Sequence, residues 1–108
     1  MKKRNENINH LFTILDKYIR SLGEVRSEAV PPDVVFYKTK STFLALKLKT
    51  KWIDVEFFLD RYDDDPIIKK CLQTSKKRFA FIVSVDSADE IGDQLKYWIS
   101  ESYDLITS

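Results

Sequence analysis

The chain has 108 residues, a formal net charge of +1, and contents of 44% hydrophobic and 32% charged residues. This length and composition predict one soluble domain over residues 1–108. The balanced charge lacks the basic excess that is common in dedicated nucleic-acid binders.

The same composition limits the compartment and the covalent chemistry. A single cysteine excludes an intramolecular disulfide, and no apolar run approaches the ~18 residues of a membrane span. No apolar stretch follows the basic residues 1–4, so no signal peptide is expected. The predicted location is therefore cytoplasmic. Residues 1–7 are the only segment for which disorder is considered.

The first predicted element is an amphipathic helix from about Asn5 to Leu22. Its apolar side chains recur every three or four residues, which is the period of one helix face. Gly23 follows where a left-handed C-terminal cap is common, and Lys17 and Arg20 suit the negative end of the helix dipole. The apolar residues of this face are Ile8, Leu11, Phe12, Leu15, Ile19 and Leu22.

Strands are predicted in the middle of the chain. Residues 24–30 are expected to form a short polar edge strand, which prolines 31 and 32 end, and residues 34–39 a β-branched and aromatic strand. The strongest pattern is strict alternation over residues 42–49 and 52–59, which predicts an antiparallel hairpin of half-buried strands. The residues that share its apolar face are Leu44, Leu46, Leu48, Ile53, Val55, Phe57 and Leu59.

A short helix is predicted after the acidic loop that follows this hairpin. Asp65 and Pro66 have the form of a helix start, with an acidic cap before a proline at the first helical position. Residues 67–72 are therefore expected to be helical, and residues 73–77 are expected to connect them to the next element.

The C-terminal third is predicted to contain a strand and a long helix. Residues 78–85 alternate between apolar and other side chains, as in a half-buried strand. Ser87 and Glu90 have the spacing of a capping box, so the final helix is expected from about residue 88 to residue 105.

This order of elements predicts the α+β class. Consecutive strands with short connections favour an antiparallel sheet of about four to five strands. The N- and C-terminal helices must bury their apolar faces, and the apolar face of the sheet is the surface available to them. The predicted architecture is a two-layer sandwich with both helices packed on one face.

The opposite face of the sheet carries most of the candidate binding residues. If Leu44 and Val55 face the helices, strand alternation points Phe43, Trp52 and Phe58 away from them, as an apolar patch with a charged rim. Such patches often mark contacts with a partner, unless loops or the short helix cover them. With two residues near the last strand, the candidates are Phe43, Lys47, Lys49, Trp52, Phe58, Ser75 and Arg78.

The favoured function is a non-catalytic module that binds a protein partner, a second copy of itself as a homodimer, or a small ligand. A second hypothesis is nucleic-acid binding through the lysine-rich hairpin of residues 38–51 and the basic residues 76–78. The alternative reading of those lysines is protection of strand edges. A third hypothesis, disfavoured, is an enzyme that uses the carboxylates of Asp54 and Glu56.

Residue types of common cofactor and metal sites are scarce. His10 is the only histidine and Cys71 the only cysteine, so they cannot build a histidine–cysteine metal cluster. Two glycines exclude a glycine-rich phosphate loop. The aspartates at 63–65 are adjacent and lack the alternating spacing of a calcium loop. No catalytic residue, metal, cofactor or membrane partner is therefore predicted.

Two segments of the chain match a recurring sequence pattern. They are Gln-Thr-Ser-Lys-Lys-Arg-Phe at residues 73–79 and the acidic–apolar alternation over residues 52–57. Over residues 14–105 the chain resembles a bacterial family of small domains of unknown function, also found at the C-terminus of longer proteins called predicted transport proteins. The resemblance implies an α+β fold and no established reaction. The positions that match recurring residues of the family are Ser75, Arg78, Trp98 and Tyr103.

Overall fold

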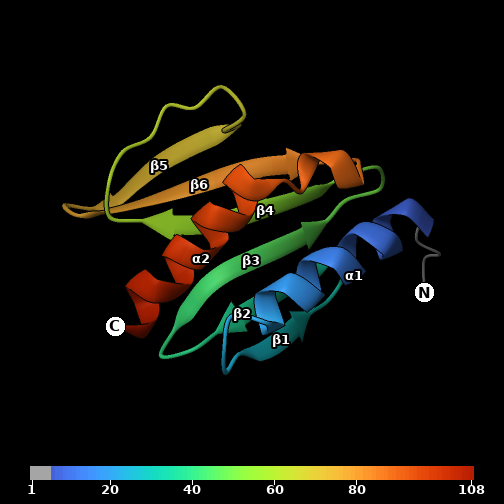
Figure 1. The fold of residues 1–108 in the computed structure, drawn as a ribbon, viewed down its shortest axis with the longest axis horizontal. Helices are drawn as coiled ribbons and strands as arrows, with labels where there is room; N and C mark the ends of the chain where they lie inside the picture. Colours follow the sequence, from blue (N-terminus) through green and yellow to red (C-terminus); the bar gives the residue numbers. More distant parts are fainter. Residues whose placement is uncertain (1–5) are drawn as a thin grey trace.

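The computed structural model describes residues 6–108, which form two layers (Figure 1). One layer is a six-stranded antiparallel sheet in the order β1-β2-β3-β4-β6-β5, and helices α1 (Glu6–Arg20) and α2 (Asp93–Thr107) both cover one of its faces. The predicted α+β class is confirmed, with one strand more than the predicted maximum. The strands are β1 (Arg26–Val30), β2 (Val34–Lys38), β3 (Thr42–Leu48), β4 (Ile53–Leu59), β5 (Lys70–Ser75) and β6 (Arg78–Val85).

Helix α1 buries the face that its sequence period predicts. Ile8, Leu11, Leu15 and Ile19 are buried against the sheet, and the helix ends at Arg20, followed by a turn. Residues 6 and 7, which the sequence left open to disorder, are the first residues of this helix. The rest of that prediction, for residues 1–5, lies outside the described residues.

The side chains of the central hairpin alternate between the two sheet faces as predicted. Leu46 lies opposite Val55, and both are fully buried beneath the helices. On β4 the burial alternates without interruption, so Ile53, Val55, Phe57 and Leu59 all contribute to the core while the residues between them do not. Phe57 is stacked between Phe81 and Trp98, at ring-centroid distances of 5.5 and 5.4 Å.

The predicted short helix at residues 67–72 is wrong. Asp65 does cap a turn, because its carboxylate accepts a hydrogen bond of 3.0 Å from the amide of Ile67, but the turn does not continue. Residues 70–75 instead form the edge strand β5, paired with β6 from Lys70 opposite Ile82 to Ser75 opposite Arg78. A short apolar run fits either structure, and here the open edge of β6 provides hydrogen-bond partners for a strand.

The final helix is interrupted near its predicted start. Residues Ala88–Glu90 form a separate 3₁₀ turn, η1, and α2 begins only after Gly92. Ser87 makes no capping hydrogen bond through its side chain, whereas Glu90 accepts one of 2.6 Å from the amide of Asp86. The predicted capping box is therefore not formed, because Glu90 binds the amide before Ser87 and not that of Ser87 itself. Neither helix in the described chain is long and apolar enough to cross a membrane.

Candidate functional site

The sheet face opposite the two helices, here called the outer face, holds most of the predicted binding residues. Side chains from neighbouring strands line up in rows across this face. One such row contains Phe36, Ala45, Glu56 and Ile82. All helices of the described chain pack on the other side, so this face has no second layer. Trp52, which immediately precedes β4, is 36% exposed here.

Phe43 is not on this face, and its predicted placement there is wrong. Tyr37 pairs with Leu44 but Lys38 pairs with Thr42, so Phe43 is an extra residue in a β-bulge. The bulge turns its ring towards α2, where it is fully buried and meets Tyr103 edge to face at 5.2 Å. Phe43 is therefore a core residue.

Asp54 organises the polar part of the outer face. One of its carboxylate oxygens accepts hydrogen bonds from the Trp52 indole at 3.0 Å and from the Ser84 hydroxyl at 2.5 Å, and the amino group of Lys69 lies 3.7 Å away. That amino group also lies 5.3 Å from the centre of the Trp52 ring. The Asp54 side chain is only 13% exposed. These contacts fix the orientation of Trp52 at the surface.

Ser84 and Lys69 were missed as partners of Asp54. Ser84 lies directly opposite Asp54 in the β4–β6 register, and Lys69 precedes β5. Neither contact is encoded in local spacing, because both depend on which strands become neighbours in the sheet. The signal in the sequence was limited to Asp54 occupying an outward position.

Asp54 and Glu56 share the outer face as predicted, and each has a lysine beside it. Lys47 lies opposite Asp54 in the register, and its amino group is 3.9 Å from a Glu56 oxygen. Both carboxylates are thus electrostatically balanced by neighbours, an arrangement that suits a structural or docking role better than proton transfer.

The predicted binding residues divide between the two ends of the sheet. Lys47, Lys49 and Trp52 lie where β3 turns into β4, near the end of β6. Ser75 and Arg78 flank the two-residue turn at the opposite end, where β5 meets β6. Phe58 lies between them and is partly exposed opposite Ala80. The predicted set therefore does not form one compact site.

Ser75 and Arg78 shape the β5–β6 turn, and Arg78 has an unusual feature. The Thr74 hydroxyl donates a hydrogen bond of 3.2 Å to the Arg78 carbonyl oxygen, which closes the hairpin. The Arg78 Nε atom is buried and has no hydrogen-bond partner among the described residues. A buried donor without a partner is costly, because it has lost its hydrogen bonds to water.

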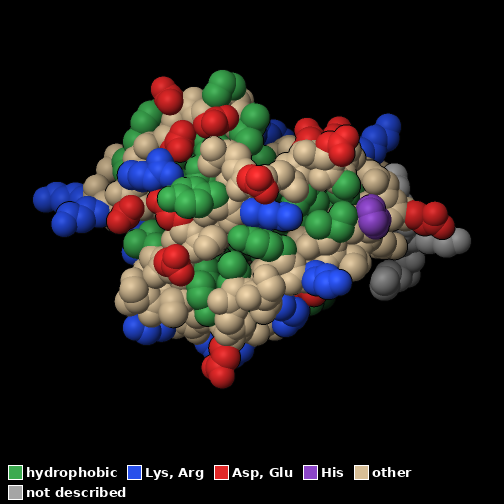
Figure 2. Space-filling model, viewed as in Figure 1, with side chains coloured by type: hydrophobic (Ala, Val, Ile, Leu, Met, Phe, Trp, Pro, Cys, Tyr) green, Lys and Arg blue, Asp and Glu red, His purple; other side chains and the backbone are tan. Residues whose placement is uncertain are grey.

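The lysine-rich segments do not merge into one basic surface. The β2–β3 and β5–β6 turns lie at one end of the sheet, and the β3–β4 turn lies at the other. Acidic side chains are interspersed among basic ones on the helix-covered face, where the basic group at the far left lies over the β5–β6 turn (Figure 2). Lys38 is paired with Glu28.

The side chains most often used for metals and nucleophilic attack are not gathered. Among residues 6–108 no group of three histidine, cysteine or acidic side chains is placed to hold a metal ion. Cys71 is half-buried in β5, and burial raises the pKa of its thiol, which disfavours the reactive thiolate.

Comparison with known proteins identifies the family. A family model for a domain of unknown function, DUF5655, matches residues 1–106. The chain belongs to this family. The expected resemblance to a family of domains of unknown function is thus confirmed. No curated protein and no solved structure gives a significant match to this DUF5655 domain.

Proposed function

We propose that this DUF5655 domain is a non-catalytic interaction module that self-associates through the outer face of its sheet. The observation that carries the proposal is the state of Trp52. Its ring is partly exposed, yet Asp54 and Lys69 hold it in one orientation. Tryptophan is enriched among the residues that dominate binding energy, and a side chain already ordered loses little entropy on association.

Further apolar side chains continue from Trp52 across the outer face. They come from five of the six strands, and their partial exposure leaves apolar area that a partner would remove from water. A second layer supplied by another molecule would complete a three-layer packing of the sheet. These side chains are Val30, Val34, Phe36, Phe58, Leu72 and Ile82.

The size of the outer face suits a dimer. Six strands at a spacing of about 4.8 Å span about 24 Å, and a seven-residue strand is about 23 Å long. The flat area is therefore roughly 550 Å², and side-chain relief brings the accessible area towards the ~800 Å² that each partner buries in a standard interface.

The charge pattern favours a second copy of the chain as the partner. A two-fold interface brings the same patch together twice, so the patch must carry both signs of charge. Lys47 beside Glu56 and Lys69 beside Asp54 meet that requirement. A polyanion is a poorer fit, because the lysines are divided between the two ends of the sheet and several have acidic partners.

The experiment is to replace Trp52 with glutamate and measure oligomeric state by sedimentation velocity over a concentration series. Wild type is expected to populate dimers, and Trp52→Glu is expected to remain monomeric with an unchanged circular dichroism spectrum. Tyr97→Glu is the matched control, because Tyr97 is a 63% exposed aromatic on α2, away from the outer face.

Leu72→Glu provides a second test on the same face with an exposed side chain, should Trp52→Glu fail to fold. A wild-type protein that stays monomeric at every concentration would contradict the proposal. Equal loss of dimer in the Tyr97 control would also contradict it, because the interface would then include the helices.

A further inference from the structure

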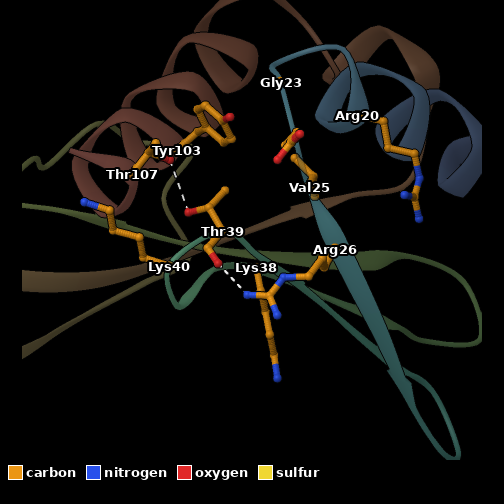
Figure 3. Close-up of a pocket in the computed structure, with 10 residues that line it drawn as sticks. Arg20, Gly23, Val25, Arg26, Lys38, Thr39, Lys40, Tyr103 and Thr107 are labelled. Carbon is orange, nitrogen blue, oxygen red and sulfur yellow. Dashed lines mark hydrogen bonds between the residues drawn. The ribbon is translucent and has the colours of Figure 1, made fainter.

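A hollow of about 650 Å³ opens at the end of the sheet where both helices finish (Figure 3). Tyr103 and Thr107 on α2 line one side, and Arg20 at the end of α1 lines the other. Residues 23–26, which lead into β1, and residues 38–40 of the β2–β3 turn complete its walls. Its volume falls within the range of small-molecule sites.

The charged side chains of the hollow are mostly cationic. Arg20, Arg26, Lys38 and Lys40 line it, against one carboxylate, that of Glu24. Two of the four cations are neutralised locally, because Arg20 pairs with Asp16 and Lys38 pairs with Glu28.

The other two cations keep uncompensated charge. Arg26 donates to the neutral carbonyl oxygen of Thr39, and in the described chain neither Arg26 nor Lys40 has an ion-pair partner. Figure 3 shows the Arg26 guanidinium directed at the Thr39 carbonyl oxygen. Its remaining N–H groups are the kind of donors that bind oxyanions.

Polar and apolar groups accompany these cations. Thr39 and Thr107 bring hydroxyls that bond to one another at 3.1 Å, and Val25 and the Tyr103 ring supply apolar surface. Gly23 has φ of +152°, and a Cβ there would overlap the Tyr103 hydroxyl oxygen. Glycine therefore allows the backbone to approach Tyr103 closely and form this wall.

We propose that this hollow binds a small organic anion, with its carboxylate or phosphate group on Arg26 and Lys40 and its apolar body against Tyr103 and Val25. The competing use of these cations is to balance the negative ends of the two helices. Arg20, in the last turn of α1, already serves that helix end. The hollow lies at one end of the sheet, and two of its cations, Arg26 and Lys38, stand in the outer-face row that follows Glu28 and Phe36.

The test is a titration of ¹⁵N-labelled protein with phenyl phosphate, benzoate, inorganic phosphate and phenol, followed by amide chemical shifts. Saturable shifts at Gly23, Val25 and Thr39 are expected with phenyl phosphate or benzoate, and the stronger of the two identifies the anionic group. Inorganic phosphate is expected to bind more weakly, and neutral phenol not to bind.

Variants decide which side chains hold the anion. Arg26→Gln and Lys40→Gln are each expected to weaken binding roughly tenfold, as loss of a charge-assisted contact does. The matched control is Lys76→Gln with Lys77→Gln, which removes two positive charges at the β5–β6 turn and should leave affinity unchanged. Lys40 is exposed in a turn, so its variant should fold even if Arg26→Gln does not.

The proposal is overturned if no ligand shifts the three amides, if phenol shifts them as much as the anions do, or if the Lys76 and Lys77 control weakens binding as much as Lys40→Gln. Lower stability of Arg26→Gln and Lys40→Gln without any saturable shift would assign these cations to the helix ends alone. Self-association through the outer face is tested separately, by sedimentation of the Trp52→Glu variant.

Discussion

The Ser102 hydroxyl on α2 donates a hydrogen bond of 2.7 Å to the carbonyl oxygen of Phe43 on β3. The hydroxyl oxygen of Ser102 in turn accepts a hydrogen bond of 3.0 Å from the amide of Phe58 on β4. Regular pairing of these strands begins one residue further along, at Leu44 opposite Phe57. A helix side chain thus bridges the backbone groups beside the bulge. Ser102 is fully buried because this bridge lies beneath α2.

Replacing Ser102 with alanine should destabilise the protein. The change leaves a buried carbonyl and a buried amide without this partner, so we expect a loss of about 1–3 kcal/mol in the free energy of unfolding. Urea denaturation measures the difference. Ser87→Ala is the control, because the Ser87 side chain caps nothing and should change stability by about 0.5 kcal/mol or less. Equal effects of the two substitutions would contradict a bridging role.

Two adjacent phenylalanines on β4 provide a test of which face is the core. Phe57→Ala should cost about 3–5 kcal/mol in unfolding free energy, because its ring is fully buried between Phe81 and Trp98. Phe58→Ala removes a partly exposed ring from the outer face and should cost about 1–2 kcal/mol. Chemical denaturation of both variants measures the two losses. A larger loss for Phe58→Ala than for Phe57→Ala would contradict the placement of the helices on the Phe57 side of the sheet.

Stability should fall in acid partly through Asp63. Burial raises the pKa of this carboxyl, but the hydrogen bonds from Arg61 and from the amide of Asp65 outweigh it, and the net shift lowers the pKa. The unfolded chain therefore takes up a proton at higher pH than the folded protein does. The stabilisation is present above the unfolded pKa and is lost as pH falls through the folded pKa.

Arg61→Gln should reduce this acid dependence. Arg61 also binds Glu101 on α2 through two hydrogen bonds of 3.0 and 2.9 Å, so the variant should lose stability at neutral pH and show a shallower decline in acid. Melting temperatures measured across the acid range give both quantities. Lys77→Gln removes the same charge from an exposed turn and should keep the wild-type slope. An Arg61→Gln slope as steep as that of wild type would refute the role of Arg61.

Gly23→Ala should destabilise the protein, and a second substitution at Tyr103 should restore part of the lost stability. The positive φ disfavours any side chain, and the new Cβ would overlap the Tyr103 hydroxyl and lie 3.2 Å from the ring carbon that bears it. We expect a loss of about 1–3 kcal/mol. Tyr103→Phe removes the overlapping oxygen, so the double variant should recover part of that loss. Thermal denaturation of the four proteins measures the coupling, and strictly additive effects would disprove the contact.

The candidate surface was predictable in part. Trp52, Lys47 and Phe58 lie on the outer face because strand alternation is a local property of backbone geometry. Phe43 departs from that alternation because a bulge, set by its pairing with β2, inserts one extra residue. The hydrogen bond from Ser84 to Asp54 and the contact of Lys69 with Trp52 depend on strand order, which local spacing does not encode.

The sequence by itself determined the fold class, the two amphipathic helices and the inward side of the central hairpin. Each of these follows from the period of apolar side chains, which matches 3.6 residues per helical turn or two per strand repeat. Only the tertiary structure decided that residues 70–75 form a strand, that Phe43 is buried, and that residues 20–26, 38–40 and 103–107 enclose a basic hollow. These features depend on contacts between segments far apart in the chain, where edge pairing, bulges and helix ends compete with local preference.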